Sequence, residues 1–84
     1  MAAADRQLRA IRQLADAGRL EQLSLGLREA AATRRALPDG DLDAISVALG
    51  VSRSAANHRL RRLVELALDE QGEQEARQPA GAGR

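Results

Sequence analysis

The 84-residue sequence contains no Phe, Tyr or Trp and no Cys. Without aromatic rings it offers no surface on which unstacked bases can stack, and it lacks the side chains that common sheet-based RNA-binding domains use. Without cysteine it can form no disulfide framework. Burial must therefore rely on Leu, Ile, Val and Ala, which suits short, closely packed helices, and duplex DNA is favoured over RNA or single strands as a nucleic-acid ligand.

Groups for catalysis and metal binding are also scarce. His58 is the single histidine, and one histidine without cysteine cannot build a closed metal shell. No Ser or Thr is spaced near both His58 and a carboxylate in a pattern typical of nucleophilic catalysis, and no glycine-rich loop could cradle a phosphate. So short a chain also leaves little room for a catalytic cleft. We therefore expect no enzymatic activity and no cofactor.

Long hydrophobic runs are absent as well. The N-terminal segment turns polar at Asp5 and Arg6, too early for the apolar region of a signal peptide, and no run approaches the length of a transmembrane helix. The sequence therefore predicts a cytoplasmic protein that makes no membrane contact.

Arginine, by contrast, is abundant and unevenly distributed. All 13 basic residues are Arg and the net charge is only +1, yet Arg53, Arg59, Arg61 and Arg62 lie close together. Acidic residues follow from Asp69 onward. Because salt screens charges beyond roughly 8 to 10 Å, this local basic segment matters more than the net charge for an anionic partner.

The same segment has the pattern of two helices joined by a tight turn. Gly50 follows an apolar helix end and can adopt the left-handed conformation that a turn requires. Val51 offers an apolar side chain to the corner, and Ser52 can cap the following helix, as Asp41 can cap the preceding one. The spacing predicts a helix-turn-helix motif over about residues 41–69.

The second helix of this motif, from about residue 52 to residue 69, has two contrasting faces. At about 100° per residue its apolar residues form one stripe that should be buried. The stripe consists of Ala56, Leu60, Leu63, Val64 and Ala67. The opposite side is basic and rich in hydrogen-bond donors; it carries Ser54, His58, Arg61, Arg62 and Glu65, with Asn57 and Arg59 on its two flanks.

Two further helices are expected upstream. One spans about residues 4–17 and ends at Gly18, and its apolar residues at helical spacing are Ala4, Leu8, Ile11 and Ala15. The other is capped by Ser24 and runs to about Leu37, with inward positions at Leu27, Ala30, Ala31 and Leu37. The sequence thus predicts an all-α fold, a small bundle of about four helices, as one domain over residues 1–70. Residues 71–84 lose apolar periodicity and are expected to form a disordered tail.

A helix with such a basic face fits the major groove of DNA, where Arg, Asn and Ser side chains distinguish base pairs. The candidate base-reading residues are Arg53, Ser54, Asn57, His58 and Arg61. We expect Arg61 to contact guanine and Asn57 to contact adenine. Ser52, together with the start of the helix, is a candidate for binding a phosphate.

Other interpretations remain open at this point. The arginines could be solvating groups on an outer face, and His58 could be a solvent-facing histidine near Glu65 without a function. Helix-turn-helix folds also dock onto proteins, so the competing function is an interaction module for a sigma factor, RNA polymerase or a partner regulator. The apolar end of the last helix around Leu68 must be covered by the first helix or by a second copy, and the latter would give a weak homodimer.

The segment Ser52-Arg53-Ser54-Ala55-Ala56-Asn57-His58-Arg59-Leu60-Arg61-Arg62-Leu63 resembles the recognition-helix motif of the WhiA family of sporulation and cell-division transcription regulators. The resemblance extends upstream through Leu27-Arg28-Glu29-Ala30-Ala31, Arg34 and Pro38, and through Ile11, Leu14, Gly18, Leu20, Glu21 and Leu23. It covers nearly everything up to about Ala67.

This resemblance implies a C-terminal helix-turn-helix domain, similar to the promoter-reading region 4 of sigma factors, that binds double-stranded promoter DNA with a GACAC-like element and acts with the iron-sulfur protein WhiB. The DNA-facing positions it implies are Arg53, Ser54, Asn57, His58 and Arg61, with Arg59 and Arg62 near phosphates. Members of the family also carry an N-terminal domain related to homing endonucleases, so we expect this chain to be a dissected domain or a fragment.

Overall fold

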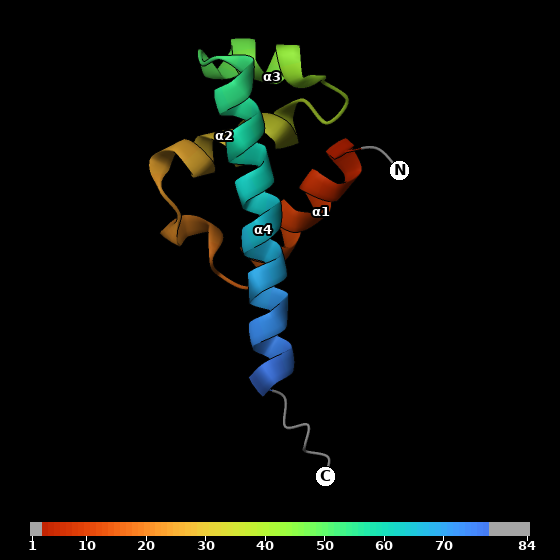
Figure 1. The fold of residues 1–84 in the computed structure, drawn as a ribbon, viewed down its shortest axis with the longest axis vertical. Coiled ribbons are helices and arrows are strands. Elements are labelled where there is room, and N and C mark those ends of the chain that lie inside the picture. Colours follow the sequence, from red (N-terminus) through yellow and green to blue (C-terminus); the bar gives the residue numbers. More distant parts are fainter. Residues whose placement is uncertain (1–2, 78–84) are drawn as a thin grey trace.

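The computed structural model describes the backbone of residues 3–77 and the side chains of residues 3–70 and 72. Its elements are α1 (Ala3–Asp16), the short 3-10 helix η1 (Leu20–Gln22), α2 (Leu25–Ala36), α3 (Leu42–Leu49) and α4 (Arg53–Arg77). The described residues contain no strand, so the predicted all-α bundle of four helices is confirmed (Figure 1).

Three of the helices begin at the cap residues that the sequence predicts. In each case the side-chain oxygen accepts a hydrogen bond from the backbone amide three residues later, which satisfies one of the free amides at a helix start. The bonds are Leu27 to Ser24 (3.4 Å), Ala44 to Asp41 (2.9 Å) and Ala55 to Ser52 (3.1 Å).

Two glycines end helices in the left-handed conformation. Gly18 after α1 has φ of 72° and Gly50 after α3 has φ of 71°. Residues with a Cβ rarely adopt such angles, whereas glycine adopts them readily. The chain can therefore turn sharply after α1 and again between the two helices of the motif.

The other helices pack around α4. Figure 1 shows α3 near the N-terminal end of α4 and α1 beside its middle, while the last turns of α4 extend beyond both. The buried core is aliphatic and comes from all four helices: Ala10, Ile11, Leu14, Ala30, Ala31, Ile45, Ala56, Leu60, Leu63 and Ala67. Of the predicted stripe on α4, only Val64 is half-buried rather than buried.

The first helix covers the side of α4 around Ala67, so the first of the two alternatives holds for this side but not for Leu68. Gln13 Nε2 donates a hydrogen bond to the carbonyl of Ala67 (3.0 Å), and Arg19 after α1 forms an ion pair with Glu70 (3.3 Å). Leu68 points away from this contact and stays 62% exposed.

The buried face of α1 differs from the predicted one. The structure buries Gln7, Ala10, Ile11 and Leu14, whereas the predicted Ala4, Leu8 and Ala15 are only half-buried. This rotation encloses Leu14 together with Ile11, both almost completely, and so buries more apolar area than a face built on two alanines. The burial of Gln7 is not predicted by the sequence, because a search for apolar periodicity assigns a polar residue to the solvent-facing side.

The end of α4 also differs from the prediction. The helix continues to Arg77 instead of ending near Asp69, so residues 71–77 are helical and not part of a disordered tail. Loss of apolar periodicity did not stop the helix because Gln, Glu, Ala and Arg favour helix without any packing partner. The rest of the expected tail, residues 78–84, lies outside the described residues. Although α4 is long, none of the described helices is apolar enough over its length to cross a membrane.

A buried arginine holds the loop between α2 and α3. Arg34 is only 3% exposed, and its Nη1 donates to the carbonyls of Leu37 (3.2 Å), Pro38 (3.4 Å) and Gly40 (2.9 Å). Burial lowers the pKa of the Arg34 guanidinium. The loop therefore has a fixed path, which sets where α3 begins and hence how the motif is positioned.

Candidate nucleic-acid interface

The turn between α3 and α4 holds the two helices of the motif in close contact. Ser46 of α3 is buried, and its Oγ donates a hydrogen bond to the carbonyl of Asp43 (2.9 Å). The hydroxyl therefore has a hydrogen-bond partner although it is buried. The Val51 amide donates to the Ser46 carbonyl (3.1 Å), and the Val51 side chain packs against the core. The N-terminal half of α4 is thereby presented on the surface.

The predicted base-reading residues lie along one side of this surface. Arg53, Ser54, His58 and Arg61 are exposed, while Asn57 is half-buried on the flank that faces α1. Of the predicted phosphate-binding residues, Ser52 and Arg62 are exposed, and Arg59 is half-buried on the flank that faces α2. The helix therefore has the outer face and the two flanks expected from its sequence.

Several of these arginines have intramolecular partners. Arg53 Nε forms an ion pair with Asp43 of α3 (2.8 Å), and Arg62 pairs with Glu65 one turn away (3.2 Å). Glu65, which the sequence offered as a neighbour for His58, thus has Arg62 as its ionic partner. These pairs are exposed, and exposed pairs contribute only about 0–1 kcal/mol, so each arginine can exchange its carboxylate for a phosphate or base at small cost.

On the α2 flank, cationic side chains lie beside the start of a helix. A Cβ built at Gly26 would lie 3.4 Å from the guanidinium carbon of Arg59, which shows that Arg59 lies against the first turn of α2. The pocket here is lined by Ser24, Gly26, Leu27, His58, Arg59 and Arg62. A helix start and nearby arginines both favour an anion.

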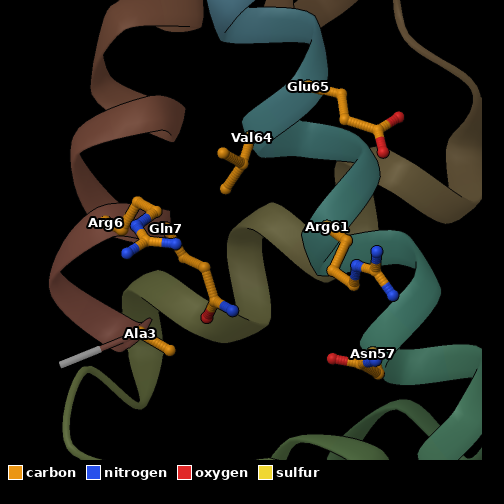
Figure 2. Close-up of a pocket in the computed structure, with 7 residues that line it drawn as sticks. All are labelled: Ala3, Arg6, Gln7, Asn57, Arg61, Val64 and Glu65. Atoms are coloured by element: carbon orange, nitrogen blue, oxygen red, sulfur yellow. The ribbon is translucent and has the colours of Figure 1, made fainter.

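On the α1 flank, a second polar pocket contains residues that the sequence analysis did not select. It is lined by Ala3, Arg6, Gln7, Asn57, Arg61, Val64 and Glu65, and Figure 2 shows the Gln7 side chain extending from α1 toward α4 while Arg6 lies over the α1 ribbon. In the sequence Arg6 marks only the point at which the N-terminal segment turns polar. The sequence signal that points to this pocket is Gln7, a polar residue on the same face of the helix as the apolar Ile11 and Leu14.

Among the residues that the structure describes, no group of three or more His, Asp or Glu side chains could hold a metal ion. The arrangement is instead a surface helix with donors on its outer face and arginines on both flanks. Such a surface can bind a duplex by its grooves and its phosphates.

Comparison with known proteins identifies the family of the chain. The model of the WhiA C-terminal HTH domain matches residues 1–67. A probable cell division protein WhiA from Symbiobacterium thermophilum is 46% identical over an alignment of 67 residues. The alignment covers 77% of this chain and 21% of the relative, so the chain spans about a fifth of that protein's length. No solved structure matches the chain. On this evidence the chain belongs to the family of WhiA C-terminal helix-turn-helix domains, a non-enzymatic DNA-binding fold.

Proposed function

We propose that this chain recognises promoter DNA sequence-specifically, with the N-terminal half of α4 lying in the major groove. The observation that carries the proposal is the exposure of Arg53, Ser54, His58 and Arg61 on one side of a helix that contributes Ala56, Leu60, Leu63 and Ala67 to the core from its other side. A packed helix is a rigid support, and rigidity is what allows side chains to discriminate between base edges.

Within this proposal the residues have different tasks. Arg61 donates two hydrogen bonds to guanine, and Asn57 pairs with adenine through its amide. Arg53, Ser54 and His58 contact neighbouring base edges. Ser52, Arg59 and Arg62 bind phosphates and set the register of the helix in the groove.

The resemblance to the family supports a GACAC-like element as the target. The name of the relative, a probable cell division protein, supports a role in cell division. A WhiB-like protein, RNA polymerase or a sigma factor would then act with the chain on the promoter.

The direct test is a fluorescence anisotropy titration of the chain against a labelled duplex with the GACAC element and against a scrambled duplex. We expect a preference for the matched duplex that survives moderate salt. The affinity for both duplexes should fall as salt rises, because bound phosphates release counterions.

A protein-docking function is the competing proposal, and it is favoured by two exposed leucines, Leu25 (61%) and Leu68 (62%). Binding through apolar contacts changes little with salt. If the chain binds neither duplex even at low salt, DNA recognition by this chain alone fails, and the docking function takes its place.

A further inference from the structure

Gln7 is a polar residue in a position that the fold does not require to be polar. It is only 9% exposed, on the face of α1 that otherwise buries Ala10, Ile11 and Leu14. Its Oε1 is buried without a hydrogen-bond partner among the described residues. Burying an unpartnered amide oxygen is unfavourable, so the glutamine does not serve the stability of the helix contact.

The amide lies instead in the pocket between α1 and α4. Figure 2 shows the Gln7 side chain extending into this space with the Arg6 guanidinium beside it. The pocket also contains Asn57 and Arg61, which belong to the proposed DNA-reading surface. Gln7 thus links α1 to that surface.

The charge of the pocket favours an anion. Arg6 and Arg61 are both exposed, and neither forms an ion pair with a described carboxylate. Arg53 and Arg62, by contrast, each form an ion pair with a carboxylate. The one carboxylate that lines the pocket, Glu65, pairs with Arg62 and points away from Arg6 and Gln7 in Figure 2.

We propose that Arg6 and Gln7 of α1 bind a backbone phosphate of DNA beside α4, a site that rests on the proposed function. The Arg6 guanidinium supplies the charge and the Gln7 Nε2 donates a hydrogen bond to the same phosphate. The pocket lies on the α1 flank of α4, so a phosphate contact there would position α4 beside the bases that Asn57 and Arg61 are proposed to read. Arg59 and Arg62 would bind phosphates on the α2 flank, so this site gives α4 phosphate contacts on both of its flanks.

The test compares three variants by anisotropy on the matched and scrambled duplexes over a range of salt. Arg6→Ala should weaken binding to both duplexes by roughly tenfold at low salt, and the slope of log affinity against log salt should become shallower by about 0.9. Arg12→Ala removes the same charge from an exposed position on the same helix that lines none of the described pockets, and it should match the unsubstituted chain.

Gln7→Leu separates a binding role from a structural one. It keeps the volume and removes the unpartnered oxygen, so the urea midpoint should stay the same or rise while DNA affinity falls about threefold. A lower urea midpoint for Gln7→Leu would instead assign Gln7 to the fold and remove it from the site.

Neutral methylphosphonates placed one at a time in the duplex identify the phosphate. One position should weaken binding of the unsubstituted chain and of Arg12→Ala but leave Arg6→Ala unaffected. If Arg6→Ala binds like Arg12→Ala while Asn57→Ala loses its sequence preference, the phosphate site is wrong and the proposed function stands. If the unsubstituted chain binds no duplex, both proposals fall.

Discussion

Asn57 and Arg62 lie five residues apart on α4 but have different surroundings. Asn57 is half-buried between α4 and α1, whereas Arg62 is exposed and already paired with a carboxylate. An amide can discriminate adenine by its paired donor and acceptor, while an exposed charge can serve any phosphate. Asn57→Ala should therefore relax sequence preference at a cost of about 1–3 kcal/mol on the matched duplex alone, and Arg62→Ala should weaken all duplexes similarly.

Anisotropy on matched and scrambled duplexes measures both effects on one pair of substrates. The ratio of the two affinities should fall for Asn57→Ala and stay constant for Arg62→Ala. Equal losses on both duplexes for both variants would refute this division between base reading and phosphate binding.

Arg34 should matter for stability and not for DNA contact. Replacing it with Met removes the side-chain donor of the Pro38 and Gly40 carbonyls, while the Leu37 carbonyl keeps its bond from the Gly40 amide (3.0 Å), and an unsatisfied buried group costs about 1–3 kcal/mol. We expect a loss of at least about 2 kcal/mol in the free energy of unfolding, measured by urea denaturation. Arg35→Met is the matched control, because Arg35 is exposed and surface changes stay within about 0.5 kcal/mol. Equal urea midpoints for the two variants would show that the Arg34 contacts do not hold the loop.

The sequence predicts residues on α4 better than residues on α1 and α2. The outer face of α4 follows from helical periodicity alone, and Ser54, His58 and Arg61 lie where that periodicity places them. Arg34 and Gln7 could not be found this way, because both are polar side chains enclosed by tertiary contacts. Periodicity assigns polar residues to solvent, and only the packed structure shows where one is enclosed.

At the scale of elements, helix boundaries depend on local chemistry. The caps at Ser24, Asp41 and Ser52 and the left-handed glycines at residues 18 and 50 involve contacts within a few residues, so the sequence predicts them. The end of α4 is different because no cap or proline marks it before residue 77. The length of α4 reflects the summed helix propensity of residues 71–77. A search for apolar periodicity does not detect this propensity.

Two glycines give opposite expectations for the same substitution. Gly50 has positive φ, and no atom lies within 4 Å of an added Cβ, so Gly50→Ala should cost about 1–2 kcal/mol through backbone strain alone. Gly72 lies within helix α4 with equally open space around it, and Gly72→Ala should favour helix by up to about 1 kcal/mol.

Circular dichroism at 222 nm with thermal melting distinguishes these two effects. Gly50→Ala should lower the melting temperature, and Gly72→Ala should raise the helical signal. A Gly50→Ala protein that melts like the unsubstituted chain would mean that the turn between α3 and α4 does not need its left-handed residue.

At the scale of the whole molecule, α4 serves both the core and the surface. Its buried stripe contacts the three other helices, and its N-terminal half carries the residues proposed to read DNA (Figure 1). A helix of 25 residues is about 37 Å long, which accounts for most of the 50 Å length of the molecule. Because the core is shared in this way, a change that loosens α1 also affects the surface that meets DNA.

The oligomeric state follows from what covers α4. Since α1 covers the side of α4 around Leu63 and Ala67, with Gln13 bonded to Ala67, a second copy is not needed to bury that side. Leu68 remains exposed, but one leucine falls far short of the roughly 800 Å² that each partner buries in a stable interface. We therefore expect the 9.0 kDa chain to sediment as a monomer and to bind one duplex site with one copy.

Analytical ultracentrifugation without DNA measures the mass of the chain in solution, and with DNA it measures the number of copies bound to each duplex. Leu68→Glu should change neither the mass nor the stoichiometry. A dimer that dissociates on Leu68→Glu would show instead that a second copy covers this end of α4, and the DNA target would then contain two half-sites.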